Sequence, residues 1–97
     1  MLNSKQRAYL RSLASEMSPS VLIGKGEVSE NILAEIDVNL EARELIKISI
    51  LQNSDSDAKS LANEIANILN AEVAGVVGRK IIMYRRSKKK GVTHIEF

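Results

Sequence analysis

Cysteine and tryptophan are absent from this 97-residue chain, and aromatic residues make up only 3 % of it. Without cysteine the chain has no disulfide, no thiol nucleophile and no thiolate metal ligand, a composition that suits a reducing compartment such as the cytosol. Hydrophobic residues nevertheless reach 44 %. The core is therefore expected to be aliphatic, built from leucine, isoleucine, valine and alanine.

Long apolar runs are also missing. Residues 1–5 lack the apolar stretch of a secretory signal peptide, and no segment approaches the ~20 apolar residues of a membrane span. We therefore expect a cytoplasmic protein without a membrane partner. A length of 97 residues supports one hydrophobic core, so the chain is expected to form a single domain over residues 1–97.

Residue sets that support catalysis or bind metals are scarce. His94 is the one histidine, and it has no histidine, cysteine or clustered carboxylates at ligand spacing. No G-x-S-x-G or Walker A motif occurs, and acidic pairs such as Glu35 and Asp37 fall on different sides of a helix. These absences argue against a small hydrolase, and we expect no enzymatic activity, cofactor, metal or small-molecule substrate.

The basic residues are concentrated at the two ends of the chain, although the net charge is only +2. Residues 1–25 carry a net charge of +3 and residues 79–97 a net charge of +6, whereas residues 26–78 carry −7. If the two ends meet in space, the protein has one basic and one acidic surface. A basic surface on a small domain indicates a polyanionic partner; the alternative is a solvated lysine tail that binds nothing.

Hydrophobic periodicity and capping residues predict seven elements in the order α-β-α-β-α-β-β. Helical spacing of apolar residues with a candidate N-cap marks each helix, and alternation marks the strands. The helices are expected at residues 4–17, capped by Ser4, at 30–42, capped by Ser29, and at 57–70, capped by Asp55 or Ser56. The strands are expected at 21–23, 45–51, 73–77 and 80–85, the last two joined as a hairpin through residues 78–79.

This order predicts an α/β domain with a four-stranded mixed sheet. Strand–helix–strand units favour parallel pairing, and the hairpin adds an antiparallel strand. We expect the second and third helices to lie on one face of the sheet. Residues 87–97 follow the last clear strand and include three consecutive lysines, so we expect them to form a flexible basic tail.

A glycine-rich loop separates the first strand from the second helix. Gly24, Lys25 and Gly26 precede the N-terminus of that helix. Unpaired N–H groups and the helix dipole favour an anion there, glycine allows its close approach, and Lys25 adds a full charge. The loop therefore has the outline of a phosphate site, although an ordinary strand-to-helix turn would explain the glycines equally well.

Five segments resemble the YhbY family, whose members are stand-alone CRM (chloroplast RNA splicing and ribosome maturation) domains. These are SKQRAYLR at residues 4–11, VLIGKG at 21–26, ILAEI at 32–36, ELIKI at 44–48 and VVGRKIIMYR at 76–85. The motifs share the family's order and similar spacing. The resemblance implies an RNA-binding domain, similar in fold to the C-terminal domain of translation initiation factor three, whose partner is ribosomal RNA in precursors of the large subunit.

The family's RNA-binding loop is commonly G-x-x-G, and this chain departs from that pattern. Glu27 stands where the family's second glycine would be, and its charge would repel phosphate. A literal G-x-x-G occurs at residues 75–78. It is apolar, lies in a predicted strand, and matches the family's strand-turn rather than its RNA loop.

The predicted RNA-binding residues are basic or belong to the glycine loop, with one tyrosine. Tyr84 and Arg85 match the family's tyrosine–arginine pair, which implies base stacking by the tyrosine and a phosphate contact by the arginine; packing of Tyr84 at a sheet edge is the alternative. Phosphate contacts would supply affinity, and RNA shape most of the specificity. The full set is Gly24, Lys25, Gly26, Lys5, Arg7, Arg11, Arg79, Lys80, Tyr84, Arg85, Arg86, Lys88, Lys89 and Lys90.

A protein-interaction module is the remaining alternative function. Its surface would be the acidic helices and the open face of the sheet. Binding that survives high salt and prefers a basic protein would favour this alternative, because binding to phosphates weakens as salt is added.

Overall fold

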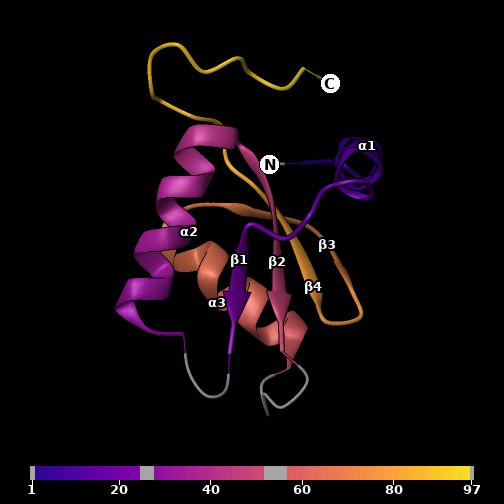
Figure 1. Ribbon diagram of the computed structural model, residues 1–97. Coiled ribbons are helices and arrows are strands. Elements are labelled where there is room, and N and C mark those ends of the chain that lie inside the picture. The colour runs from indigo at the N-terminus through magenta and orange to yellow at the C-terminus, as the bar shows by residue number, and fades with distance from the viewer. Residues whose placement is uncertain (1, 25–27, 52–56, 97) are drawn as a thin grey trace.

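The computed structural model describes residues 2–24, 28–51 and 57–96, which contain three helices and four strands in the predicted order (Figure 1). The helices are α1 (Ser4–Ala14), α2 (Glu30–Arg43) and α3 (Ala58–Leu69). The strands are β1 (Val21–Ile23), β2 (Leu45–Ile50), β3 (Glu72–Val77) and β4 (Lys80–Tyr84). None of the described helices combines the length and the apolar composition of a membrane span.

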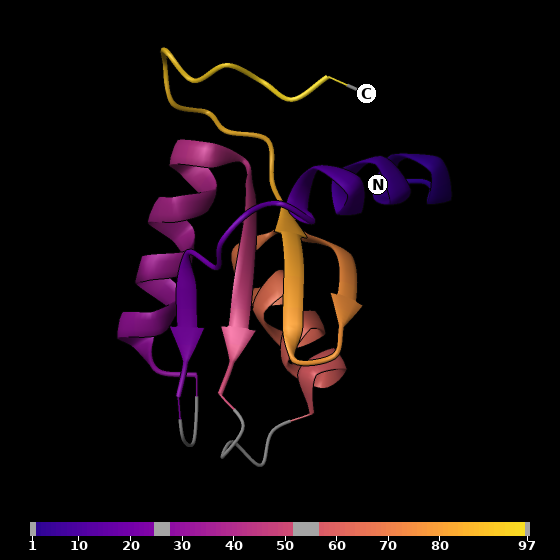
Figure 2. The same ribbon diagram turned by 45° about the vertical axis from the view of Figure 1, so that its right-hand side comes forward.

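The strands form one mixed sheet in the order β1-β2-β4-β3 (Figure 2). β1 and β2 are parallel and are connected through α2, whereas β4 is antiparallel to both of its neighbours. The register aligns Ile48 on β2 with Val21 on β1 and with Ile81 on β4. The predicted α/β class and four-stranded mixed sheet are therefore confirmed, and β3 lies at an edge of the sheet.

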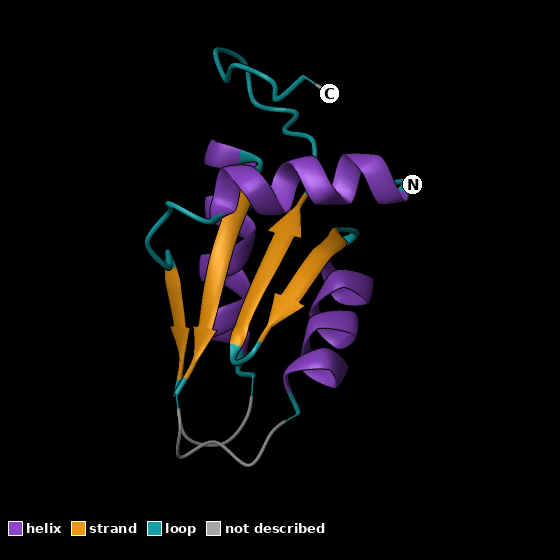
Figure 3. Ribbon diagram, turned by 90° about the vertical axis from the view of Figure 1, so that its right-hand side faces the viewer, coloured by secondary structure: helices purple, strands orange, loops and turns teal. Residues whose placement is uncertain are grey.

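α2 and α3 cover one face of the sheet, as predicted (Figure 3). The alternation along β2 turns its three isoleucines to this face and Lys47 and Ser49 to the other. Each fully buried aliphatic side chain stabilises the fold by about 1.5–3 kcal/mol. The larger of two hydrophobic cores lies in this layer and includes Ile36, Leu40, Ile46, Ile48, Leu61 and Ile65.

α1 packs against the opposite face of the sheet, near the end where β2 begins, and covers only part of it (Figure 3). Its buried residues Leu10 and Ala14 form a second core with Leu45, Ile82 and Tyr84. We call the remainder of this side the open face. The strand register aligns a row of residues across it, Leu22, Ser49, Lys80 and Val77, of which Leu22 and Val77 are 57 % and 63 % exposed.

The first helix begins at Ser4, as predicted, but its N-cap and its last residue differ from the prediction. Its N-cap is Asn3 rather than Ser4, because the Asn3 side chain accepts the Gln6 N–H at 2.8 Å while the Gln6 side chain accepts the Asn3 N–H at 3.0 Å. This reciprocal capping box satisfies two helix-end donors that a serine alone would not. The helix ends at Ala14, three residues before the predicted end.

The caps of the other two helices confirm one prediction and correct another. Ser29 caps α2 as predicted and accepts a backbone N–H at 3.2 Å. The N-cap of α3 is Asp57, whose carboxylate accepts the Ser60 N–H at 3.2 Å and the Ser60 hydroxyl at 2.9 Å. The predicted caps Asp55 and Ser56 lie outside the described residues, and the cap belongs to a different residue from either.

The segment after β4 is bound to the domain, which corrects the expectation of a flexible tail. Ser87 is only 4 % exposed, and its N–H donates to the buried carboxylate of Glu44 at 2.7 Å. The Ile95 N–H donates to the same carboxylate at 2.7 Å, and the Ile95 side chain packs against the second core. We call Glu44 with Ser87, His94 and Ile95 the C-terminal clasp. Its bonds run to side-chain acceptors rather than to a strand ladder, so no periodic pattern marks this segment in the sequence.

Candidate nucleic-acid interface

The basic side of α1 is formed by Arg7 and Arg11, whereas Lys5 lines a separate depression with Gln6 and Tyr9. Arg7 and Arg11 lie one helical turn apart, so both project from the same side of the helix. Arg7 Nη1 donates to the carbonyl oxygen of Leu2 at 2.7 Å, and Arg11 Nη1 donates to that of Ala74 at 2.9 Å. Neutral carbonyl oxygens therefore hold both guanidinium groups in place without neutralising their charge.

Gly75 allows Arg11 to lie directly against β3. A Cβ atom at position 75 would lie 2.5 Å from Cδ and 2.9 Å from Cγ of Arg11, closer than side chains can approach. The register of β3 and β4 shifts between Val73 and Gly75, and the carbonyl of Ala74, in this irregularity, accepts the Arg11 bond. The glycine is thus required for the close approach of the arginine.

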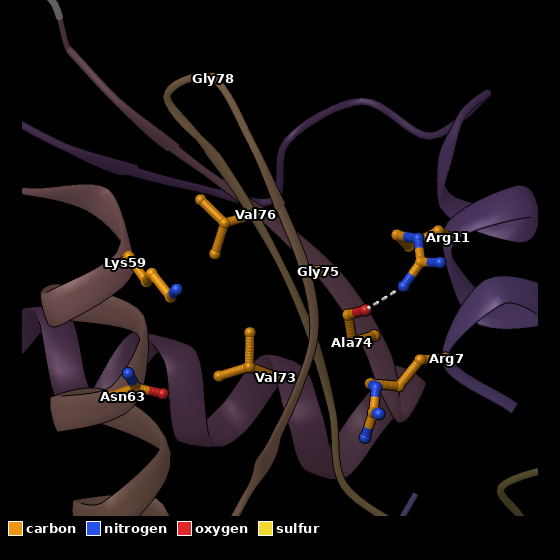
Figure 4. A pocket seen from close by; sticks show the side chains of 9 residues that line it. All are labelled: Arg7, Arg11, Lys59, Asn63, Val73, Ala74, Gly75, Val76 and Gly78. Carbon is orange, nitrogen blue, oxygen red and sulfur yellow. Dashed lines mark hydrogen bonds between the residues drawn. The ribbon is translucent and has the colours of Figure 1, made fainter. Parts of the chain in front are cut away.

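A groove crosses β3 between α1 and α3, and we call it the edge groove. It encloses about 540 Å³. Figure 4 shows Arg7 and Arg11 on one side of β3, and Lys59 and Asn63 on the other. The described residues that line it include no acidic side chain. Both sides of the groove are therefore cationic. The surface between the two sides is formed by the β3 backbone and small apolar side chains.

A smaller depression lies on the open face beside α1, and we call it the face hollow. It encloses about 280 Å³, and its basic residues are Arg11, Lys47 and Lys80. Lys47 Nζ donates to the carbonyl oxygen of Met17 at 3.0 Å, which holds the ammonium near the end of α1. Because Arg11 lines both the edge groove and the face hollow, the two form one continuous basic area.

The cations of this area have no carboxylate partner among the described residues. The ion pairs found among the described residues involve Arg85 and His94, which lie outside the basic area. Lys59 is two residues from the Asp57 carboxylate and helps to lower its pKa, but the hydrogen bonds from Ser60 are the larger cause. The positive charge of the basic area is therefore available to an external anion.

Tyr84 is packed in the protein interior and not presented for base stacking. Its exposed fraction is 7 %, and its side chain belongs to the second core. Burial is the main reason that the pKa of its phenol is raised. The structure thus supports the alternative in which the tyrosine packs inside the sheet, and it corrects the stacking prediction.

Arg85 is bound within the protein, which corrects its prediction as a phosphate contact. Its Nη1 donates to Asp37 Oδ1 at 2.7 Å and to the carbonyl of Leu69 at 2.9 Å. Its Nη2 donates to the Asp37 carbonyl and to Glu41 Oε2, each at 3.2 Å. The guanidinium of Arg85 is therefore already paired with two carboxylates. The run of basic residues in the sequence could not show this, because the partner carboxylates are distant in the chain.

The remaining predicted basic residues lie in two different places. Lys80 joins the basic area through the face hollow, and Arg79 lies half-buried in the turn before it. Arg86 and Lys88 instead line a depression together with the acidic side chains of Asp37 and Glu41. The structure therefore brings Arg11 together with Lys80. It does not bring them together with the basic residues after β4, of which Lys89 and Lys90 are exposed.

Only part of the predicted phosphate loop can be placed. Gly24 follows β1 and is half-buried, and a Cβ there would meet Leu51 Cδ1 at an ordinary contact distance of 3.7 Å. Lys25 and Gly26 lie outside the described residues, as does Glu27. Their role in phosphate binding stays a prediction.

Three polar residues of the basic area were not predicted from the sequence. Lys47, Lys59 and Asn63 belong to the acidic middle segment of the chain, so charge runs do not reveal them. Lys59 and Asn63 are four residues apart on α3 and therefore share a side of that helix. Only the position of β3 beside α3 shows that Lys59 and Asn63 line the same groove as the two arginines.

Comparisons with known proteins agree with this fold. The profile of the CRS1 / YhbY (CRM) domain matches residues 2–85. The probable RNA-binding protein YqeI of Bacillus subtilis is 38 % identical over 89 residues, which cover 92 % of this chain and 93 % of that protein. A protein of Haemophilus influenzae named RNA-binding protein is 33 % identical over 89 residues, covering 91 % of this chain and 89 % of its own length.

A solved structure shares the same architecture. The solution structure of the hypothetical protein SAV1595 from Staphylococcus aureus matches this chain with a TM-score of 0.80 and 46 % sequence identity. The match covers 93 % of this chain and 94 % of that one. At this TM-score, identity and coverage, the two chains share the same fold.

Proposed function

Because this chain belongs to the CRS1/YhbY (CRM) domain family, as its motifs predicted, we propose that it binds RNA through the basic area beside α1. The observation that carries the proposal is that Arg7, Arg11 and Lys59 line one groove without a carboxylate partner in the described chain. Two relatives are named as RNA-binding proteins. Cations in a concave surface favour a polyanion, because each bound phosphate releases counterions.

The proposed activity is binding without catalysis. Arginines fixed by carbonyl oxygens lose little side-chain entropy when a phosphate arrives, so the basic area is already organised for its ligand. Among the described residues, no three histidine or acidic side chains gather as a metal-binding group. Phosphate contacts supply affinity in this proposal, and the shape of the RNA supplies most of the specificity.

The RNA that we propose is ribosomal RNA within precursors of the large subunit. The support for this finer assignment is the family resemblance carried by the sequence motifs. Ultraviolet crosslinking of the protein to RNA in cells, followed by sequencing of the bound fragments, tests it. Enrichment of large-subunit ribosomal RNA is the expected result, and crosslinks spread over messenger RNA in proportion to abundance would contradict it.

Binding in solution tests the basic area itself. We expect affinity for a ribosomal RNA fragment to fall with salt, with a slope of log affinity against log salt of roughly −3.5 to −4.5 if about five phosphates are contacted. Arg11→Ala should weaken binding, because Arg11 lines both depressions. Arg43→Ala removes the same charge from an exposed position on α2 and is the matched control. Binding that is unaffected by salt and by Arg11→Ala, and that prefers a basic protein, would favour an interaction module instead.

The glycine loop is proposed as a second contact. Lys25→Ala is expected to reduce discrimination between ribosomal RNA and an unrelated RNA of equal length, as measured by competition binding. Glu27→Gly is expected to strengthen binding modestly, because one negative charge is removed beside the loop. If neither variant changes affinity while Arg11→Ala does, the loop is only a turn and α1 alone provides the interface.

A further inference from the structure

We propose that the edge groove holds the backbone of a single RNA strand where it passes round the β3 edge of the sheet, from α1 on one face to α3 on the other. This inference rests on the proposed RNA-binding function. It adds the form of the RNA, single-stranded at this point, and a phosphate contact at Lys59, which lies outside the segments that carry the family resemblance.

The position of the groove on an edge strand is the first support. β3 pairs with β4 on one side, and β4 separates it from β2 on that side. α1 and α3 both contact β3 but lie on opposite faces of the sheet. In Figure 4 the two arginines and the Lys59–Asn63 pair point into the groove from the two sides of the strand. A ligand that contacts both groups therefore has to cross the edge of β3.

The distribution of charge is the second support. Arg7 and Arg11 lie at one side of the groove and Lys59 at the other, with Val73 and Val76 between the strand and α3. An anion that repeats along a chain can place a negative charge at each side of the groove.

The curvature of this path favours a single strand. The domain measures only 36 × 26 × 23 Å, and a strand that passes from one face of the sheet to the other turns within that distance. Double-helical nucleic acid is stiff on this scale, with a persistence length of about 50 nm for DNA. A single strand bends freely. No aromatic side chain lines the groove among the described residues, so the contact is to the backbone, and its sequence preference should be weak.

The test compares single-stranded and duplex RNA with a substitution in the groove. Lys59 is exposed, so Lys59→Ala should preserve the fold, which circular dichroism checks. We expect affinity for a single-stranded 20-nucleotide RNA to fall about three- to tenfold and the salt slope to become less negative by roughly 0.7. Affinity for a blunt hairpin duplex should stay unchanged. Lys90→Ala, an equal charge change at an exposed position away from the groove, should have a smaller effect on single-stranded binding.

Several outcomes would overturn the inference. If Lys59→Ala behaves as Lys90→Ala does while Arg11→Ala still weakens binding, the groove does not carry the strand, although the RNA-binding function stands. Equal losses on duplex and single strand would exclude a single-strand path. If Lys59→Ala weakens binding to a polyglutamate peptide but leaves RNA affinity unchanged, the groove binds an acidic protein and not RNA. If the protein binds no RNA in any form, the proposed function itself fails.

A second measurement locates the RNA directly. The chain has no cysteine, so Lys59→Cys introduces one thiol that a benzophenone photocrosslinker labels at a single site. We expect this derivative to crosslink to the single-stranded RNA on illumination, whereas the same label at position 90 crosslinks weakly. Equal crosslinking from both positions would contradict the path through the groove.

Discussion

The buried carboxylate of Glu44 and the imidazole of His94 are in contact across 50 residues of sequence, with Oε2 and Nδ1 2.5 Å apart. Glu44 is fully buried, and its two oxygens also accept the N–H groups of Ser87 and Ile95. Its backbone adopts a φ of 67° at the end of α2, a conformation that costs a non-glycine residue free energy. The bonds of the C-terminal clasp compensate for that cost and fasten the last segment to α2.

Glu44→Gln is expected to lower stability at neutral pH and to weaken its pH dependence. Burial raises the pKa of Glu44, but hydrogen bonds from His94, Ser87 and Ile95 together lower it below the ordinary 4.5. A carboxyl whose pKa is lower in the folded state stabilises the protein above its unfolded pKa, and this contribution is lost as pH falls through the folded pKa. Urea unfolding at pH 7, 5, 4 and 3 should therefore show a smaller loss on acidification for the variant. Parallel losses in both proteins would contradict this assignment.

Deletion of residues 87–97 is expected to destabilise the domain, because it removes three partners of Glu44 and two of Glu41. A hydrogen bond to a charged group contributes about 1.5–3 kcal/mol to the free energy of unfolding. After the deletion, water can bond to the exposed carboxylates and recover part of this free energy. We expect a loss of about 2 kcal/mol or more in urea unfolding.

A chain that ends at Ile95 is the control for this deletion, since it keeps the clasp. It should retain most of the stability of the full chain. In the shorter variant the pKa of Glu41, which the Lys88 N–H lowers most, should return toward its ordinary value in an NMR titration. Full stability of the shorter variant would restore the interpretation of this segment as a free tail.

The architecture could be predicted because its determinants are local. The spacing of Leu61, Ile65 and their neighbours specifies which side of α3 is buried, and the alternation of Ile46 and Ile48 with Lys47 specifies the faces of β2. The parallel pairing of β1 and β2 then follows from the helix between them. Each of these steps uses residues close together in sequence.

The site could be predicted only in part, because its contacts join distant segments. Arg7 and Arg11 were identified from charge, but Lys59 belongs to an acidic stretch and reaches the same groove only through the position of β3. Arg85 shows the converse error, since its charge suggested RNA and its partners, such as Asp37, lie 48 residues away. The sequence shows how many charges a segment has. Whether those charges are free to bind a phosphate depends on tertiary contacts.

Arg85→Ala should reduce stability more than RNA binding, and Arg86→Ala should spare stability. Arg85 bonds to two carboxylates and two carbonyl oxygens across α2 and the end of α3, whereas Arg86 is exposed. We expect Arg85→Ala to lower the free energy of unfolding by about 1–2 kcal/mol. Arg85→Lys should recover little, because an ammonium cannot reproduce the two-sided geometry of guanidinium. Thermal unfolding and RNA titration of the three variants measure both effects, and a stable Arg85→Ala protein with lost RNA binding would reinstate the phosphate contact.

The close approach of Arg11 to Gly75 leads to a prediction whose sign depends on the background. Gly75→Ala places a Cβ 2.5 Å from Arg11 Cδ, so the arginine must move and lose its bond to the Ala74 carbonyl. We expect a loss of about 1–3 kcal/mol in stability from this crowding together with weaker RNA binding.

In an Arg11→Ala background the clash is absent. The φ of Gly75 is outside the left-handed region, so alanine should there be neutral or stabilising by about 0.5–1 kcal/mol, the usual gain over glycine within a strand. A double-mutant cycle in urea measures the coupling, and an equal loss from Gly75→Ala in both backgrounds would show that the glycine serves the strand itself and not the arginine.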